Sequence, residues 1–113
     1  MAIHNLLGAA AEDEVKKFLS KNRYKILDSN WKTKWCEIDI VAKKDKVIHF
    51  VEVKYRNSSS QGSGFDYINS KKLTQMARAA DSWVAINKWD GEYVLSAAEV
   101  SGDNFKIEFI AEI

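Results

Sequence analysis

Two acidic residues and one lysine on neighbouring predicted strands carry the chemistry that this sequence suggests. Side chains alternate across a strand, so the register of a hairpin decides which residues share a face. We take Ala42 to pair with Val47 across a four-residue turn. Asp39, Glu52 and Lys54 then project from one face of the hairpin. Adjacent carboxylates repel each other and burial disfavours their charged forms, so such a cluster needs a compensating cation.

A hard divalent cation would meet that need. Mg²⁺ binds oxygen ligands in octahedral geometry, typically one or two carboxylates together with water and substrate phosphate. Asp39 and Glu52 fit this role, with Glu37 beside them, and Lys54 would stabilise negative charge on an attacked phosphate. The alternative is an exposed strand face whose charges serve only solubility. A Glu-X-Lys pattern alone favours the solubility interpretation. With Asp39 at the matching position on the neighbouring strand, the metal site and the solubility interpretation have equal weight.

The other side chains of the hairpin predict one covered end and one open end. Val41, Ile48 and Phe50 share the face of the acidic residues but lie nearer to the turn. A solvated face would not need these apolar residues, so we expect another element to cover them while the ionic end opens into a cleft. The opposite face is predicted to be core and carries Ile38, Ile40, Ala42, Val47, His49, Val51 and Val53.

Hydrophobic periodicity predicts the two helices and five strands that must position these residues. Apolar residues recur at three- and four-residue spacing in residues 5–22 and 66–87. Alternation and turn residues predict strands at residues 24–27, 35–42, 47–54, 92–100 and 105–113. Residues 57–64, rich in Ser and Gly, form either a connector or a lid. The fold class is therefore α+β or mixed α/β, with a sheet flanked by helices.

Composition predicts a single domain, residues 1–113, in a reducing compartment. The chain is 46% hydrophobic and 29% charged, as ordinary globular proteins are. Its one cysteine, Cys36, excludes an internal disulfide, so we expect a cytoplasmic protein. We expect no membrane span and no signal peptide. Residues 16–56 hold twelve Lys and Arg against five Asp and Glu, so only this region would attract polyanions.

Several motifs together resemble one family of small bacterial proteins. The segments "AED", "YKILDSNWKTKWCEIDIVAKKDKVIHFVEVKYR" and "KKLTQMARAADSWV" are similar to the YraN-like family, predicted nucleases of the PD-(D/E)XK superfamily that are related to archaeal Holliday junction resolvases. The resemblance runs from about Gly8 to Val84. It implies a restriction-endonuclease-like core with the order α, β, β, β, α, β, which agrees with the order predicted from the periodicity.

The resemblance also implies a role for each matching residue. Asp39 and Glu52 would be metal ligands, the Val53 carbonyl a third ligand, and Lys54 the catalytic lysine. Glu12 matches a first-helix glutamate that approaches the same metal. Glu37 matches the glutamate of the family's Gly-Glu-Ile-Asp run. The sequence departs from the family pattern at three positions, where it has Ala11 and Cys36 in place of Gly and Ser70 in place of Pro.

Other residues have a functional and a structural interpretation. Arg56, Lys71 and Lys72 would contact phosphates or lie solvated on the surface. Trp31, like Trp35, would stack on an unpaired base, although packing explains most large aromatic residues. Without the family, a helical ion pair with Lys16 would explain Glu12. We interpret His49 as a buried core histidine, and Cys36 as a small apolar residue.

The sequence therefore predicts a Mg²⁺- or Mn²⁺-dependent endonuclease. Its substrate would be DNA, including branched or single-strand-containing structures, cut by in-line attack of an activated water. Two alternatives remain at this point: a non-catalytic nucleic-acid-binding module with the nuclease fold, and an RNase that uses the same site. The resemblance also admits a homodimer, because duplex-cutting enzymes of this superfamily often pair.

Overall fold

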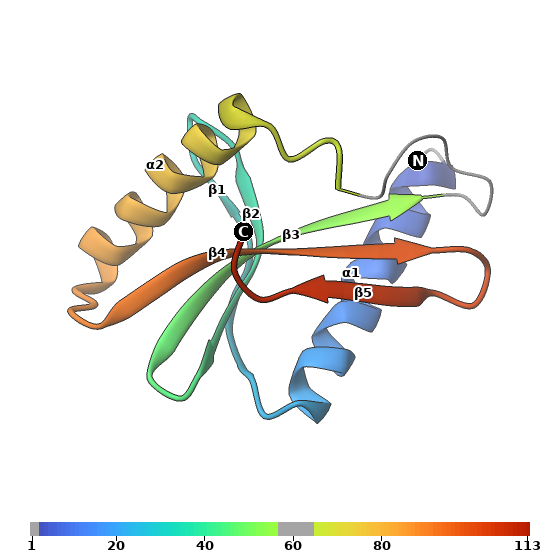
Figure 1. Cartoon of the computed structure of the whole chain (residues 1–113), viewed down its shortest axis with the longest axis horizontal. Coiled ribbons are helices and arrows are strands. Elements are labelled where there is room, and N and C mark those ends of the chain that lie inside the picture. Colours follow the sequence, from blue (N-terminus) through green and yellow to red (C-terminus); the bar gives the residue numbers. More distant parts are fainter. Residues whose placement is uncertain (1–2, 57–64) are drawn as a thin grey trace.

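A computed structural model describes residues 3–56 and 65–113 of the chain, with side chains from Leu6 onward. The predicted Ser- and Gly-rich loop at residues 57–64 lies outside the described residues. The elements follow the predicted order (Figure 1): α1 (Ile3–Lys21), β1 (Lys25–Lys32), β2 (Glu37–Lys44), β3 (Val47–Arg56), α2 (Ser70–Asn87), β4 (Glu92–Ser101) and β5 (Lys106–Ile110). The mixed α+β class is therefore confirmed.

The five strands form one mixed sheet in the order β1-β2-β3-β4-β5. Strands β3 and β4 run parallel, with Glu52 opposite Ala97, and the other neighbouring strands are antiparallel. Parallel neighbours need a long crossover connection, and α2 lies within this one. In Figure 1, α1 runs behind the strands, while α2 lies beside β1 and β2.

The hairpin of β2 and β3 has a tighter turn than the sequence predicted. Lys44 pairs with Val47, so Asp45 and Lys46 alone form the turn. Both have positive φ, 52° and 68°, as a two-residue hairpin turn with matching twist requires. Ala42 consequently pairs with His49, and the predicted pairing with Val47 was wrong. The error is two residues, an even number, so the predicted division into faces is preserved for the paired residues from Ile40 to the turn.

Each face of the sheet packs against one helix. Ala11, Val15 and Leu19 of α1 are fully buried against the face that carries Ile40 and Val51. The opposite face packs against α2 through the cluster Ile38, Val41, Ile48, Phe50, Ala79, Ala80 and Trp83. This confirms the prediction that an element covers the turn end of the ionic face. Ile38 is an exception, since alternation placed it on the other face.

Two predicted boundaries were wrong by more than three residues. Strand β1 continues to Lys32, beyond the predicted end at residue 27, because a bulge at Leu27 shifts the register and pairing then resumes. Helix α2 begins at Ser70 and not near residue 66, because Asn69 caps it with a side chain that accepts a hydrogen bond from Lys72 N. Neither helix, within the described residues, is long and apolar enough to span a membrane.

Candidate metal centre

Asp39 lies where β2 and β3 separate. The pairing of the two strands ends at Ile40 and Val51, so Asp39 and Glu52 are not opposite each other in the ladder. Instead, the Asp39 carboxylate accepts a hydrogen bond of 2.7 Å from Val53 N. This contact places one oxygen of Asp39 against the backbone between Glu52 and Lys54. Because the two strands separate here, the Asp39 side chain can accept the hydrogen bond from Val53 N in place of a backbone carbonyl.

The electrostatic environment of this pair is unfavourable to two negative charges. Burial and the neighbouring Glu52 raise the pKa of Asp39 to about 8. Burial also raises the pKa of Glu52, although Lys72 and Lys54 oppose this effect. Lys72 Nζ lies 3.3 Å from Glu52 Oε2. Lys72, predicted to contact nucleic acid, therefore already has a carboxylate partner within the site.

The side-chain amide of Asn30 binds the two other predicted site glutamates, Glu12 and Glu37. Asn30 Nδ2 donates hydrogen bonds to Glu12 at 2.8 Å and to Glu37 at 2.9 Å. Asn30 has a φ of 51°, a left-handed conformation that asparagine adopts more readily than most residues. Reasoning from the residues alone missed Asn30. Its only signal was its place, just before Trp31, in the longest of the segments that resemble the family.

Lys54 and Arg56 flank the same aromatic ring. Lys54 Nζ lies 5.8 Å and Arg56 Cζ 5.7 Å from the ring centroid of Tyr67, which precedes α2. Arg56 Nε also lies 2.7 Å from Glu99 Oε2, in an ion pair between two largely buried side chains. The predicted phosphate contact of Arg56 stays a prediction, and the structure gives this guanidinium a carboxylate partner.

Sequence reasoning did not identify Tyr67 or Glu99. Glu99 pairs with Lys54 in the register of β3 and β4, and only 6% of it is exposed. Its signal was a charged residue within the apolar run "SAAEV". The Tyr67 hydroxyl is buried and has no hydrogen-bond partner among the described residues, and burial raises the pKa of this phenol. The site therefore extends from the hairpin to β4 and to the entry of α2.

Three other predicted residues take structural positions. His49 Nδ1 lies 2.9 Å from Ser96 Oγ and 3.1 Å from the Ala111 carbonyl, and burial lowers its pKa, as a buried histidine requires. Cys36 packs beside the cluster under α2, and burial raises its pKa, which does not favour a nucleophilic thiolate. Trp31 packs against the same cluster, so its predicted stacking on a base stays untested.

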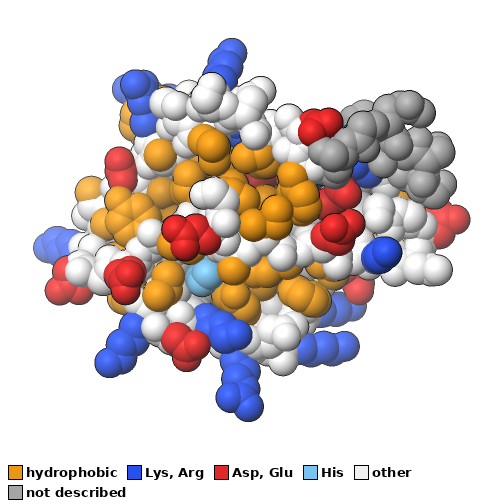
Figure 2. Space-filling view, in the orientation of Figure 1, with side chains coloured by type: hydrophobic (Ala, Val, Ile, Leu, Met, Phe, Trp, Pro, Cys, Tyr) orange, Lys and Arg blue, Asp and Glu red, His pale blue; other side chains and the backbone are white. Residues whose placement is uncertain are grey.

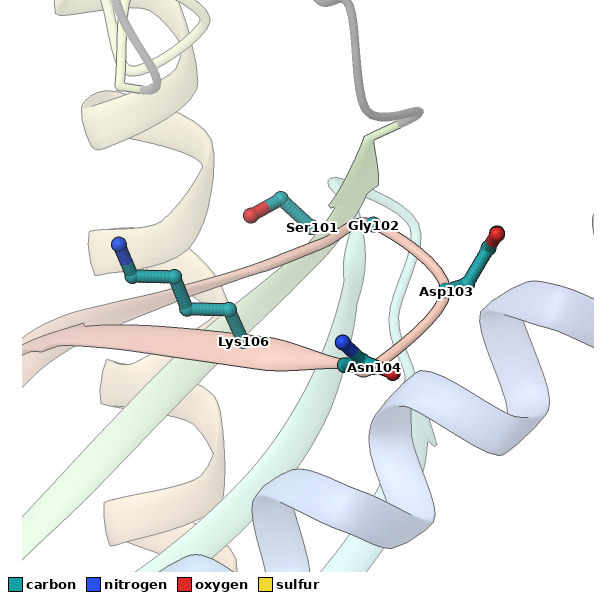
Figure 3. A pocket seen from close by; sticks show the side chains of 5 residues that line it. All are labelled: Ser101, Gly102, Asp103, Asn104 and Lys106. Atoms are coloured by element: carbon teal, nitrogen blue, oxygen red, sulfur yellow. The ribbon is translucent and has the colours of Figure 1, made fainter.

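Two hollows lie away from the carboxylate pair. One, of about 460 Å³, is lined by Trp35, Arg78, Asp81 and Ser82. The other, of about 360 Å³, lies at the turn between β4 and β5, where Ser101 and Lys106 point to one side and Asp103 points away (Figure 3). Asp39 and Glu52 line neither hollow.

The carboxylates of the site could supply only some of the ligands of a Mg²⁺ ion. Within residues 3–56 and 65–113, no three Asp, Glu, His or Cys side chains converge closely enough to enclose a metal ion. Asp39 and Glu52 supply two carboxylates, which is the number that Mg²⁺ commonly takes from a protein. Their mutual repulsion in a half-buried position is the physical reason to expect a cation there.

The fold and the site define a small mixed α/β protein with a carboxylate pair and lysines at the open end of a hairpin. Residues 11–110 match the Uncharacterised protein family UPF0102, and the chain belongs to this family, so the YraN-like resemblance is confirmed. A UPF0102 protein of Flavobacterium johnsoniae is 35% identical over 118 residues, which cover 99% of this chain and 96% of the relative. A UPF0102 protein of Flavobacterium psychrophilum is 38% identical over 110 residues, covering 96% and 92% of the two chains. A third relative, from Geobacter metallireducens, is 42% identical over 86 residues, covering 75% and 70%.

Proposed function

We propose that this protein is a metal-dependent phosphodiesterase that cuts DNA internally. The observation that carries the proposal is the contact of Asp39 with Val53 N at 2.7 Å, which sets one carboxylate between Glu52 and Lys54. Two carboxylates and a lysine at one point are the groups that phosphate ester hydrolysis needs: oxygen ligands for a cation and a positive charge near the phosphate.

Asp39 and Glu52 would hold Mg²⁺ or Mn²⁺, with the Val53 carbonyl and Glu12 as the further predicted ligands. When bound, the cation would neutralise phosphate charge and lower the pKa of a water molecule. The hydrogen bond from Val53 N fixes the direction of the Asp39 carboxylate, so this ligand is oriented before any cation arrives. Asn30 fixes Glu12 and Glu37 in the same way.

Lys54 would stabilise the negative charge that develops on the attacked phosphate. Its side chain is exposed and lies over the Tyr67 ring, so the ammonium is held near the site while it remains accessible to a substrate. Lys72 has a different role, since its 3.3 Å contact with Glu52 balances part of the acidic charge. The family resemblance supports these assignments because it matches the same residues to nuclease motifs.

One observation favours a second function, a nucleic-acid-binding module without catalysis. Lys72 already supplies a positive charge to Glu52, which reduces the need for a metal ion there. Such a module would bind DNA without metal and would retain binding when Asp39 is replaced. An RNase with the same site is the third function. A cytoplasmic location and a homodimer belong to the proposal as well.

A cleavage assay tests the proposal. The purified chain is incubated with duplex, flapped, branched and single-stranded DNA and with matched RNA, in Mg²⁺ or Mn²⁺. We expect DNA cleavage that Asp39→Asn abolishes and that Lys54→Ala lowers about 10²- to 10³-fold, the usual cost of removing one charge-stabilising group. Asp45→Asn is the matched control, because Asp45 is exposed in the hairpin turn. No cleavage of any substrate, or equal cleavage by Asp39→Asn, would refute the nuclease.

A further inference from the structure

The hollow between the start of β2 and the outer side of α2 has the composition of a nucleotide site. Its volume of about 460 Å³ lies within the range of small-molecule sites. The described residues that line it are one large aromatic residue, one cation and two hydrogen-bonding groups: Trp35, Arg78, Asp81 and Ser82. We infer that this hollow binds one unpaired nucleotide of the substrate, an inference that rests on the proposed function.

The backbone that carries the Trp35 side chain is held in place before any ligand binds. Thr33 Oγ1 accepts hydrogen bonds of 3.1 Å from both Trp35 N and Cys36 N, and it donates one of 2.7 Å to the Cys36 carbonyl. The turn that carries the indole is therefore fixed by one hydroxyl group. A rigid aromatic platform loses little conformational entropy when a base stacks on it.

Charges around the indole suit a phosphate and a base edge. Lys34 Nζ lies 5.2 Å from the Trp35 ring centroid, and Arg78 forms no ion pair with the described residues. Both can attract the phosphate of a nucleotide stacked on the ring. Asp81 is oriented by a hydrogen bond of 2.5 Å from the Tyr93 hydroxyl, and a carboxylate can accept from an exocyclic amino group of a base.

The hollow favours an unpaired base over a base pair. In a duplex both faces of each base are covered by stacked neighbours, so a side chain cannot reach them unless the base is exposed. Single-strand binders use aromatic platforms with adjacent cations, which is the arrangement of Trp35, Lys34 and Arg78. Trp31, the other predicted platform, packs against the cluster under α2 and does not line the hollow.

Two elements connect the hollow to the carboxylate pair at a suitable distance. Trp35 precedes Asp39 by four residues, which span at most about 13 Å even in fully extended chain. Arg78 follows Lys72 by six residues of α2, about 9 Å along the helix axis. Successive phosphates of one strand lie about 3.4 Å apart along a stacked helix. A strand cut at the carboxylate pair would thus place a nucleotide only a few steps away in the hollow.

Metal-free binding tests this inference separately from catalysis. A fluorescein-labelled oligodeoxycytidylate, whose bases carry an exocyclic amino group, is titrated with the wild-type chain in EDTA at several salt concentrations. We expect Trp35→Ala to weaken binding at least fivefold, the lower end of the range for one stacked base, and Trp35→Phe to retain most of it. Arg78→Ala should lower the slope of log affinity against log salt by about 0.7. Lys106→Ala, the same charge change at an exposed position of β5 outside residues 16–56, should leave affinity unchanged. Circular dichroism confirms that each variant is folded.

Photocrosslinking locates the contact. An oligonucleotide with one 5-iodouracil is irradiated with the protein, and tryptic peptides are identified by mass spectrometry. Each tryptophan lies in a different tryptic peptide, and Trp35 lies in residues 35–43. A crosslink in that peptide is the expected result. No metal-free binding, or binding that Trp35→Ala leaves unchanged with the crosslink elsewhere, would overturn the inference. Trp35-dependent binding without any DNA cleavage would support the nucleotide site and refute the nuclease.

Discussion

At the scale of the residue, Asp39 is the position where function and stability conflict. Its carboxylate is half-buried, contacts Val53 N and lies in the field of Glu52. These surroundings raise its pKa to about 8, so at neutral pH the fold either holds a proton or bears the cost of a buried charge. Proteins often retain such unfavourable charges where activity requires them.

Replacing Asp39 by Asn should stabilise the metal-free protein. The amide oxygen can still accept from Val53 N, whereas the charge is lost. Because the folded-state pKa is raised from 3.8 to about 8, proton binding favours the wild-type fold below pH 3.8, and this advantage is lost as pH rises to 8. A tenfold change in proton binding is worth about 1.4 kcal/mol, so we expect a gain of at least about 1 kcal/mol at pH 8.5. Urea unfolding at pH 5 and 8.5 measures it. An equal effect at both pH values would contradict this prediction.

His49 should make stability depend on pH in the opposite direction. Burial lowers its pKa below 6.5, so the folded state favours the neutral ring, which contacts Ser96 and the Ala111 carbonyl. This contribution is complete above pH 6.5 and is lost as pH falls through the folded-state pKa. We expect His49→Gln to reduce the fall in melting temperature between pH 7.5 and pH 5. An unchanged fall would show that the ring is not the group that titrates.

At the scale of the element, α2 joins the two sites. Its first turn places Lys72 beside Glu52, and its third turn places Arg78 at the hollow. Trp83 Nε1 donates to Asp28 of β1 at 3.4 Å, while the indole packs edge-to-face on Phe50. The position of α2 on the sheet therefore determines the distance between the carboxylate pair and the hollow.

Asn69, the N-cap of α2, should affect both the stability of the helix and the position of Lys72 in the site. Asn69→Ala removes the acceptor of Lys72 N, and loss of such a cap costs about 1 kcal/mol. Since Lys72 lies in the first turn, fraying there would also weaken its contact with Glu52. We expect a lower urea midpoint for Asn69→Ala and a near wild-type midpoint for Asn69→Ser, which retains a cap. Equal midpoints for Asn69→Ala and wild type would contradict the assigned cap.

The sequence determined most of this arrangement, for reasons that particular residues make clear. Alternation predicted that Asp39, Glu52 and Lys54 share one face, and an error of two residues in the turn does not change that parity. Contacts between segments that are distant in the sequence could not be predicted, because they leave no periodic pattern in the residues. The Lys72–Glu52 pair and the Asn30 bridge depend on how helix, strand and hairpin meet. The bulge that lengthens β1 also follows from pairing and not from its own residues.

At the scale of the whole molecule, charge is unevenly distributed. Figure 2 shows Lys and Arg side chains around much of the rim of one face, with hydrophobic and acidic side chains across its middle. The lysines in and next to the hairpin turn, Lys43, Lys44 and Lys46, lie at the end of β2 and β3 away from Asp39. A polyanion attracted by the basic region would therefore extend along the hairpin to reach the carboxylate pair.

A Mn²⁺-soaked crystal tests the central claim, a divalent cation site at the open end of the hairpin, most directly. Anomalous diffraction locates Mn²⁺ independently of any activity. We predict one strong anomalous peak between the carboxylates of Asp39 and Glu52, which is lost in crystals of Asp39→Asn and kept in crystals of Asp45→Asn. A peak only at other residues, or none at millimolar Mn²⁺, would contradict the account.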